Sequence, residues 1–127
     1  MASYQNLLYE KQRQGVLITL NRSEQRNALN EPLLAELDAA LAEAKDDPHV
    51  RGVILTGAGS CFSTGEDMSQ EGSAETVWPQ ALPKGTPLYK EFDEVRDRDR
   101  EELLRRRLYR WEYPKPIIGA VNGWCLG

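Results

Sequence analysis

Residues 52–68 read GVILTGAGSCFSTGEDM, and the architecture of the chain can be built outward from them. The first five residues are apolar enough to predict a strand that is buried on both faces. Residues 57–60 are expected to form a loop, and a short helix is expected to begin near Gly65 or Glu66. Backbone N–H groups at such a turn point toward any anion placed there. The plain alternative is a strand-to-helix loop with Asp67 in the first turn and no ligand.

Two strands and a helix are predicted upstream of this stretch. The ranges Leu7–Gln12 and Gly15–Asn21 are expected to be strands joined by a tight connection, the second being rich in β-forming residues. A helix is predicted from Glu31 to Lys45, because Asn30 can cap it and Pro32 suits its first turn. Its apolar face is formed by residues at helical spacing: Leu33, Leu34, Leu37, Leu41 and Ala44. The order strand–strand–helix–strand–helix indicates an α/β fold.

Downstream, the chain reaches a second strand that runs into a glycine-marked turn. Residues 71–87 are loop-like because of their prolines, and a charged helix is predicted over about 88–109. A strand is expected over 116–121, and turn residues follow it. If the two strand ends converge, their free N–H groups can meet one oxygen, which is the arrangement of an oxyanion hole. Taken alone, the second segment is a buried strand and a bend with no ligand.

The chain stops at residues 122–127 on an apolar, glycine-marked segment without a polar tail. The ends of domains normally lie exposed and frayed. We therefore expect a truncation, a nick or one half of a split protein.

The charge balance bounds the partners of this 127-residue chain. Its net charge is −4 and its pI is about 5.1. An acidic chain has no general attraction to nucleic acid or to anionic membranes. The apolar runs are far shorter than the roughly 20 residues that a membrane span needs, and the N-terminus lacks the pattern of a signal peptide. We expect a cytoplasmic protein with no nucleic-acid or membrane partner.

Imidazole and metal chemistry are both disfavoured. His49 is the only histidine, and it follows an Asp-Asp-Pro turn, so it is expected on the surface. A serine or cysteine triad would therefore lack its base. Cys61 and Cys125 lie beside apolar residues without metal-type spacing, and they are expected to be two buried thiols. No metal site is predicted.

Three motifs in order resemble the crotonase (enoyl-CoA hydratase/isomerase) superfamily. They are GVLITLNR at 15–22 with RNALN at 26–30, VILTG at 53–57 with CFSTGEDM at 61–68, and KPIIGAVNG at 115–123 with LG at 126–127. The resemblance implies that residues 1–127 are the N-terminal part of a single crotonase-like domain, a spiral of ββα units that is incomplete at the C-terminus. It implies a loop and helix insertion at about 71–110. It also implies a homotrimer or hexamer, or a C-terminal half supplied as a separate chain.

The same resemblance implies the ligand and its contacts. The ligand is an acyl-CoA thioester, with coenzyme A as part of the substrate and no other cofactor. The first oxyanion donor matches the backbone N–H of Glu66, and Gly127 is adjacent to the second donor. The positions that match the substrate-binding residues of the family are Glu24, Gln25, Arg26, Thr64, Gly65, Asp67 and Met68. The general acid and base, two glutamates in hydratases of the family, are expected beyond residue 127.

The function implied is hydration of a 2-enoyl-CoA by the complete protein, with the thioester carbonyl polarised in a backbone oxyanion hole. The alternative is a non-catalytic truncated or split half that only binds CoA thioesters or partner subunits. A third hypothesis is an unrelated α/β domain. The acyl group, and the choice between hydration and isomerisation, dehydration or hydrolysis, depend on residues after 127.

Overall fold

The computed structural model describes residues 3–67, 69, 104–106 and 108–126, and all structural statements refer to these. The chain divides into two compact units. The first comprises Met1–Asp67 and Pro114–Gly127, and the second comprises Met68–Tyr113. Each unit is described by itself.

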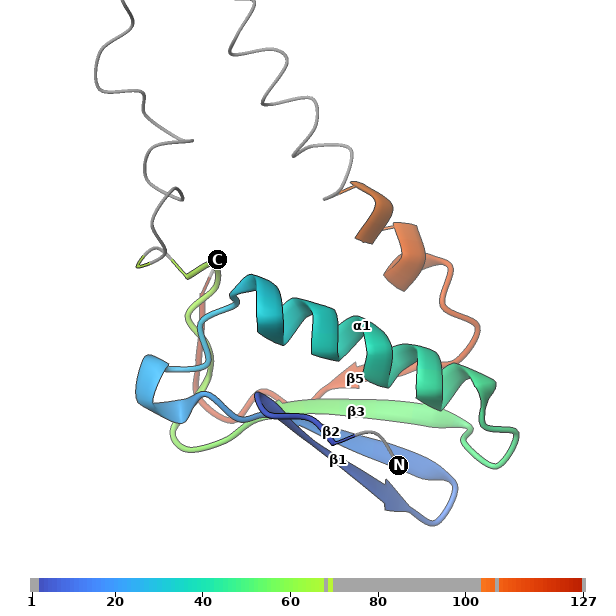
Figure 1. Cartoon of the computed structure of the whole chain (residues 1–127). Coiled ribbons are helices and arrows are strands. Elements are labelled where there is room, and N and C mark those ends of the chain that lie inside the picture. The colour runs from blue at the N-terminus through green and yellow to red at the C-terminus, as the bar shows by residue number, and fades with distance from the viewer. Residues whose placement is uncertain (1–2, 68, 70–103, 107, 127) are drawn as a thin grey trace, which may run out of the picture. The chain divides into compact units, whose positions relative to one another are not determined.

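A four-stranded sheet forms the frame of the first unit (Figure 1). Its strands are β1 (Leu7–Gln12), β2 (Gly15–Leu20), β3 (Gly52–Gly57) and β5 (Ile117–Gly119), in the order β1-β2-β3-β5. The pair β1–β2 is an antiparallel hairpin, turned through Arg13 at a φ of 51°. The pairs β2–β3 and β3–β5 are parallel, with Val16 opposite Val53 and Val53 opposite Ile117.

The helix α1 (Glu31–Asp46) lies across one face of this sheet (Figure 1). Its cap is the predicted one, because the side chain of Asn30 accepts a hydrogen bond from the Leu33 N–H at 3.1 Å. The core forms between the buried helix residues Leu33, Leu37, Ala40, Leu41 and Ala44 and the buried sheet residues Leu7, Val16, Ile18, Leu20 and Val53. At the C-terminal end of α1, the Lys115 ammonium donates hydrogen bonds to the carbonyls of Ala44 and Asp47. These bonds satisfy carbonyl groups that have no partner within the helix.

A second, two-stranded parallel sheet lies beyond the end of β3. It pairs β4 (Cys61–Ser63) with β6 (Trp124–Cys125). The backbone at Gly57 lies so close to the start of β4 that only glycine fits there. A Cβ on Gly57 would lie 2.5 Å from the Cys61 carbonyl oxygen. The Asn122 side chain ties the two segments together: it accepts from the Gly57 N–H and donates to the carbonyls of Gly57 and Gly59.

The predicted elements agree with most of the first unit. The strand Leu7–Gln12 is confirmed as β1, and the expected strand at 15–21 ends at Leu20. The helix runs one residue further than expected, to Asp46, and the strand at 116–121 is confined to Ile117–Gly119. The strands β4 and β6 were not predicted.

Two local predictions are wrong. Residues 65–67 are not helical, because Gly65 has a φ of 84° and Glu66 forms a parallel bridge with Leu29. The strand β3 is not buried on both faces, because Ile54 on the face opposite α1 is 41% exposed.

The described part of the second unit is helical. Residues 104–106 and 108–111 have helical backbone, in agreement with the charged helix predicted to end near 109. The ring of Tyr109 meets that of Tyr113 edge-on, with centroids 6.0 Å apart. Most of the expected insertion at 71–110 lies outside the described residues. Among the helices that are described, none is long and apolar enough to cross a membrane.

Candidate functional site

A single buried side chain, that of Asn27, organises the loop between β2 and α1. This loop contains the short 3₁₀ helix η1 (Ser23–Gln25). The Asn27 side chain is fully buried, accepts a hydrogen bond from the Arg22 N–H at 2.9 Å, and donates to the carbonyls of Ala58 and Cys61 at 3.0 and 2.7 Å. Its φ of 54° is a left-handed conformation that asparagine tolerates better than most residues. The loop is therefore fixed to the turn after β3.

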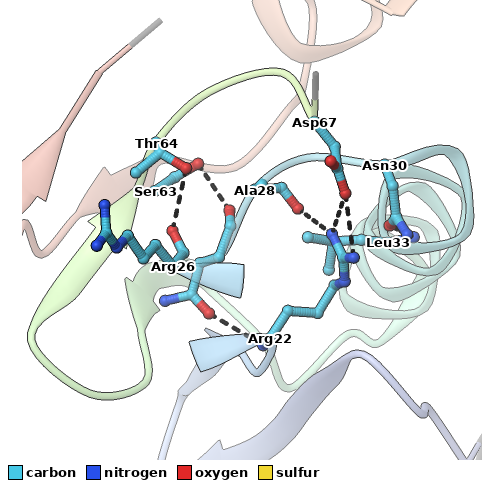
Figure 2. Close-up of polar contacts among 9 residues, drawn as sticks. Arg22, Arg26, Ala28, Asn30, Leu33, Ser63, Thr64 and Asp67 are labelled. Atoms are coloured by element: carbon cyan, nitrogen blue, oxygen red, sulfur yellow. Dashed lines mark hydrogen bonds and ion pairs between the residues drawn. The ribbon is translucent and has the colours of Figure 1, made fainter. Parts of the chain in front are cut away.

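The segment that leaves β4 is bound to the same loop (Figure 2). The Ser63 hydroxyl donates to the Asn27 carbonyl at 2.8 Å. It also accepts a hydrogen bond from the Gly65 N–H at 3.1 Å. Between them, the Thr64 N–H donates to the Arg26 carbonyl at 3.2 Å. Two consecutive N–H groups of this segment thus have partners inside the protein.

The next two residues form a bridge to Leu29, and this bridge sets the direction of one N–H group. The Leu29 N–H donates to the Gly65 carbonyl at 2.8 Å, and the Asp67 N–H donates to the Leu29 carbonyl at 3.0 Å. The Gly65 carbonyl and the Glu66 N–H belong to one planar trans peptide, so they point in opposite directions. The Glu66 N–H therefore points away from Leu29, and within the described residues it donates to no acceptor.

A buried ion pair closes this bridge from one side (Figure 2). The Arg22 guanidinium contacts the Asp67 carboxylate, with Nη1 and Nη2 at 3.2 and 3.1 Å from Oδ2. Its Nη1 also donates to the Ala28 carbonyl. The Arg22 and Asp67 side chains are only 13% and 6% exposed. The guanidinium thus joins the loop before α1 to the residue that follows Glu66.

The second strand end lies beside the first. Trp124 is opposite Cys61 and Cys125 is opposite Ser63 in the parallel pair β4–β6, and the Leu126 N–H donates to the Ser63 carbonyl at 3.0 Å. Because the pairing is parallel, both segments leave their strands at the same end. Gly127, which was expected to adjoin the second oxyanion donor, lies outside the described residues.

The predicted site residues that are described gather around these two loops. Glu24, Gln25 and Arg26 have exposed side chains on η1 and at its end, and the Arg26 carbonyl contacts Thr64. Gly65 is buried, whereas the Glu66 side chain is exposed. The Asp67 carboxylate is turned toward Arg22. Met68 lies outside the described residues.

Four residues that build the site received no role from the sequence: Arg22, Asn27, Leu29 and Ser63. Three of them lie inside the motif at 15–30 that carries the resemblance, so their positions were visible but their contacts were not. One usable signal was the asparagine itself, since asparagine favours turns and left-handed backbone.

The ionisable side chains described outside these loops do not form part of the site. Away from the site, burial raises the pKa of Tyr4 and Tyr9, and the ion pair between Lys11 and Asp47 raises the pKa of the lysine and lowers that of the aspartate. In the described ranges, no group of three His, Cys, Asp or Glu side chains is arranged to hold a metal ion. His49 is exposed, as expected, and Cys61 is buried. The expectation of a second buried thiol is wrong, because Cys125 in β6 is exposed.

The sequence matches the family described as Enoyl-CoA hydratase/isomerase over residues 10–127. It is 34% identical to a probable enoyl-CoA hydratase of Mycobacterium tuberculosis over all of this chain and 43% of that protein. It is also 34% identical to the short-chain-enoyl-CoA hydratase of Clostridium acetobutylicum, over 96% of this chain and 41% of that protein.

Solved structures give the same family. An enoyl-CoA hydratase/isomerase from Xanthobacter autotrophicus is similar with a TM-score of 0.71 and 32% identity, over 95% of this chain and 40% of that chain. The protein therefore spans about two fifths of the length of these relatives. Its fold is the corresponding part of a crotonase α/β fold. The chain belongs to the enoyl-CoA hydratase/isomerase family.

Proposed function

We propose that this chain binds an acyl-CoA thioester and polarises its carbonyl through the backbone N–H of Glu66. The observation that carries the proposal is the direction of that N–H, which the hydrogen bond between Gly65 and Leu29 turns away from Leu29 and leaves without an acceptor among the described residues. A donor held in place before the substrate arrives stabilises negative charge on a carbonyl oxygen without reorganisation. Gly65 supports this role, because it lacks a side chain that would block a ligand's approach.

A second donor is expected next to Gly127. The parallel pairing of β4 and β6 supports this, because it brings the two outgoing segments to the same end of one small sheet. Two N–H groups that meet one oxygen would make a complete oxyanion hole. The chain's own residues supply the first donor and lead to the second.

Coenzyme A would lie along the exposed side of the same loops. Glu24, Gln25 and Arg26 offer solvent-facing side chains next to Thr64, and the Arg26 guanidinium is suited to a phosphate. The proposed contacts continue through Gly65 to Met68. The Asp67 carboxylate pairs with Arg22, so we propose that this side chain supports the site through the ion pair and not through a contact with the ligand.

In the complete protein, this arrangement would serve the hydration of a 2-enoyl-CoA. The supporting relatives are named enoyl-CoA hydratases, and the chain spans about two fifths of their length. We propose that the general acid and base lie on the remaining part, and that the protein assembles as a trimer or hexamer. No cofactor beyond the CoA of the substrate is needed for this chemistry.

The second candidate is a non-catalytic half that binds CoA thioesters or partner subunits. It is favoured by the apolar side chains exposed on the face of the sheet opposite α1, where Ile54 and Ile118 lie on adjacent strands. A surface of this kind is typical of a binding face. Denaturing intact-mass measurement shows whether a second polypeptide of roughly similar size is present in the purified sample. If it is, enoyl-CoA hydration measured on the complex separates the candidates, because only a split enzyme should catalyse it.

The donor itself is tested with ¹³C-carbonyl crotonyl-CoA and infrared spectroscopy. Hydrogen bonding to the thioester oxygen should lower its C=O stretching frequency on binding. The variant Glu66→Pro removes the N–H and should abolish the shift, whereas Glu66→Ala keeps the N–H and should preserve it. An unchanged shift in Glu66→Pro would exclude Glu66 as the donor. If the wild-type chain binds neither crotonyl-CoA nor free CoA, the CoA-binding proposal itself is wrong.

A further inference from the structure

Two of the ion pairs among the described residues differ in burial. Lys11 and Asp47 pair at the surface, where the lysine side chain is 47% exposed. Arg22 and Asp67 pair where the two side chains are 13% and 6% exposed. The net contribution of a buried pair to stability is small because desolvation offsets the attraction, but its geometry is well defined when a guanidinium fork is involved. The main effect of the buried pair is therefore on the orientation of the groups it joins.

The Arg22 fork holds both sides of the Leu29–Glu66 bridge. On one side it contacts the carbonyl of Ala28, the residue before Leu29. On the other side it contacts the carboxylate of Asp67, the residue after Glu66. Drawing these neighbours together keeps the bridge's two hydrogen bonds, Leu29 to Gly65 and Asp67 to Leu29, at bonding distance.

Without this restraint, the peptide between Gly65 and Glu66 could rotate. Rotating this peptide changes ψ of Gly65 and φ of Glu66, and Gly65, which has no Cβ and a φ of 84°, can adopt a wider range of backbone angles than other residues. Rotation of this peptide would break the hydrogen bond from Leu29 and turn the Glu66 N–H toward the protein. The orientation of the donor thus depends on contacts outside Gly65 itself.

We infer that Arg22 and Asp67 are positioning residues that hold the Glu66 N–H in its outward orientation. The inference rests on the proposed function of that N–H. It assigns to the Asp67 carboxylate a role through Arg22 rather than a direct contact with the thioester. Neither side chain takes part in proton transfer.

The first test follows amide hydrogen exchange by NMR in the 127-residue chain. In Arg22→Gln, the amides of Leu29 and Asp67 should exchange at least about tenfold faster, since their shared bridge opens locally. The amides of Ile18 and Val53 in the sheet should be unchanged. The matched control is Arg51→Gln, which makes the same chemical change at an exposed arginine and should alter none of these amides.

Two results of this exchange experiment would overturn the inference. One is unchanged exchange at Leu29 and Asp67. The other is an equal acceleration at all four amides, which would show that Arg22 stabilises the whole unit and not the bridge. If Arg22→Gln does not fold, Asp67→Asn removes the opposite charge while keeping the side-chain shape, and the same comparison applies.

The second test measures the carbonyl shift of bound ¹³C-crotonyl-CoA. Arg22→Gln should lose most of the shift while the dissociation constant for free CoA, which has no acyl carbonyl, stays within about twofold of wild type. Arg22→Lys should recover part of the shift, because a lysine keeps the charge but cannot span both acceptors. A full shift in Arg22→Gln would overturn the positioning role. Absence of a shift in the wild type would instead overturn the proposed function, and the exchange experiment would still decide whether the pair orients the bridge.

Discussion

Asn27 joins three segments of backbone through one side chain, so its removal should be costly. In Asn27→Ala, the Arg22 N–H and the carbonyls of Ala58 and Cys61 lose their partner in a buried place. We expect the free energy of unfolding to fall by about 3 kcal/mol, since each unsatisfied buried group costs about 1–3 kcal/mol. Urea denaturation followed by circular dichroism measures this. Asn21→Ala, at an exposed position, should change it by less than about 0.5 kcal/mol.

Tyr4 should make the folded state sensitive to alkaline pH. Burial and the hydrogen bond that its hydroxyl donates to Glu43 raise the pKa of Tyr4 from 10.0 to about 12. The folded state therefore holds this proton more tightly than the unfolded state. The resulting stabilisation is complete below pH 10 and is lost as the pH rises from 10 to 12. Urea midpoints measured from neutral pH to about pH 11 should fall less steeply in Tyr4→Phe. An identical slope in both proteins would contradict the prediction.

The roles of individual side chains were the part that the sequence could not supply. The motifs at 15–30 and 61–68 placed Arg22 and Asp67 in the two loops that form the site. Their pairing depends on the distance between residues 45 positions apart, and that distance follows only from the folded loops. Local propensity describes neighbours along the chain, whereas an ion pair depends on neighbours in space.

The helix α1 begins with a cap whose energy can be measured. In Asn30→Ala, the Leu33 N–H loses the side-chain oxygen that accepts its hydrogen bond. The unfolding free energy should fall by about 1 kcal/mol, the usual value for an N-cap residue. Asn30→Asp should keep most of the stability, since aspartate caps as well as asparagine. A loss in Asn30→Asp as large as that in Asn30→Ala would contradict capping as the mechanism.

The long elements were predictable, whereas two of the short strands, β4 and β6, were not. The strands β1, β2 and β3 and the helix α1 carry hydrophobic patterns of six residues or more, which is enough for period and propensity to agree. By contrast, β4 and β6 have three and two residues, and each exists only because the other lies beside it. The same reason explains why the helix expected to begin near Gly65 or Glu66 does not begin there, since the bridge to Leu29 joins this backbone to another segment.

One face of the main sheet is covered by α1, and the other carries apolar side chains in the open. Ile118 on this open face is 58% exposed, whereas Val53, which faces the helix, is 1% exposed. The sequence predicted burial on both sides of β3 because it shows only that a strand is apolar. What covers the second face is not a property of the strand itself.

This open face makes a prediction about association. Ile118→Lys should reduce the binding of a hydrophobic dye and the self-association measured by sedimentation, because it places a charge in an exposed apolar patch. It should change the unfolding free energy by less than about 0.5 kcal/mol. Val53→Ala should instead cost about 2 kcal/mol, since it leaves a cavity in the core. Strong destabilisation by Ile118→Lys would show that the face is already occupied.

The hydrogen bonds between Asn122 and the turn after β3 affect how readily this asparagine deamidates. Asn122 precedes Gly123, and asparagine before glycine deamidates readily when the next backbone nitrogen can attack its side-chain amide. Here the amide is held by hydrogen bonds to Gly57 and Gly59. Deamidation converts the neutral amide into a negatively charged carboxylate. This conversion should be slower in the folded chain than in the urea-unfolded chain, and isoelectric focusing can follow it. Once formed, an aspartate at this position could no longer donate to either carbonyl, so the segment between β5 and β6 would lose two hydrogen bonds to the turn after β3 as a stored sample grew older.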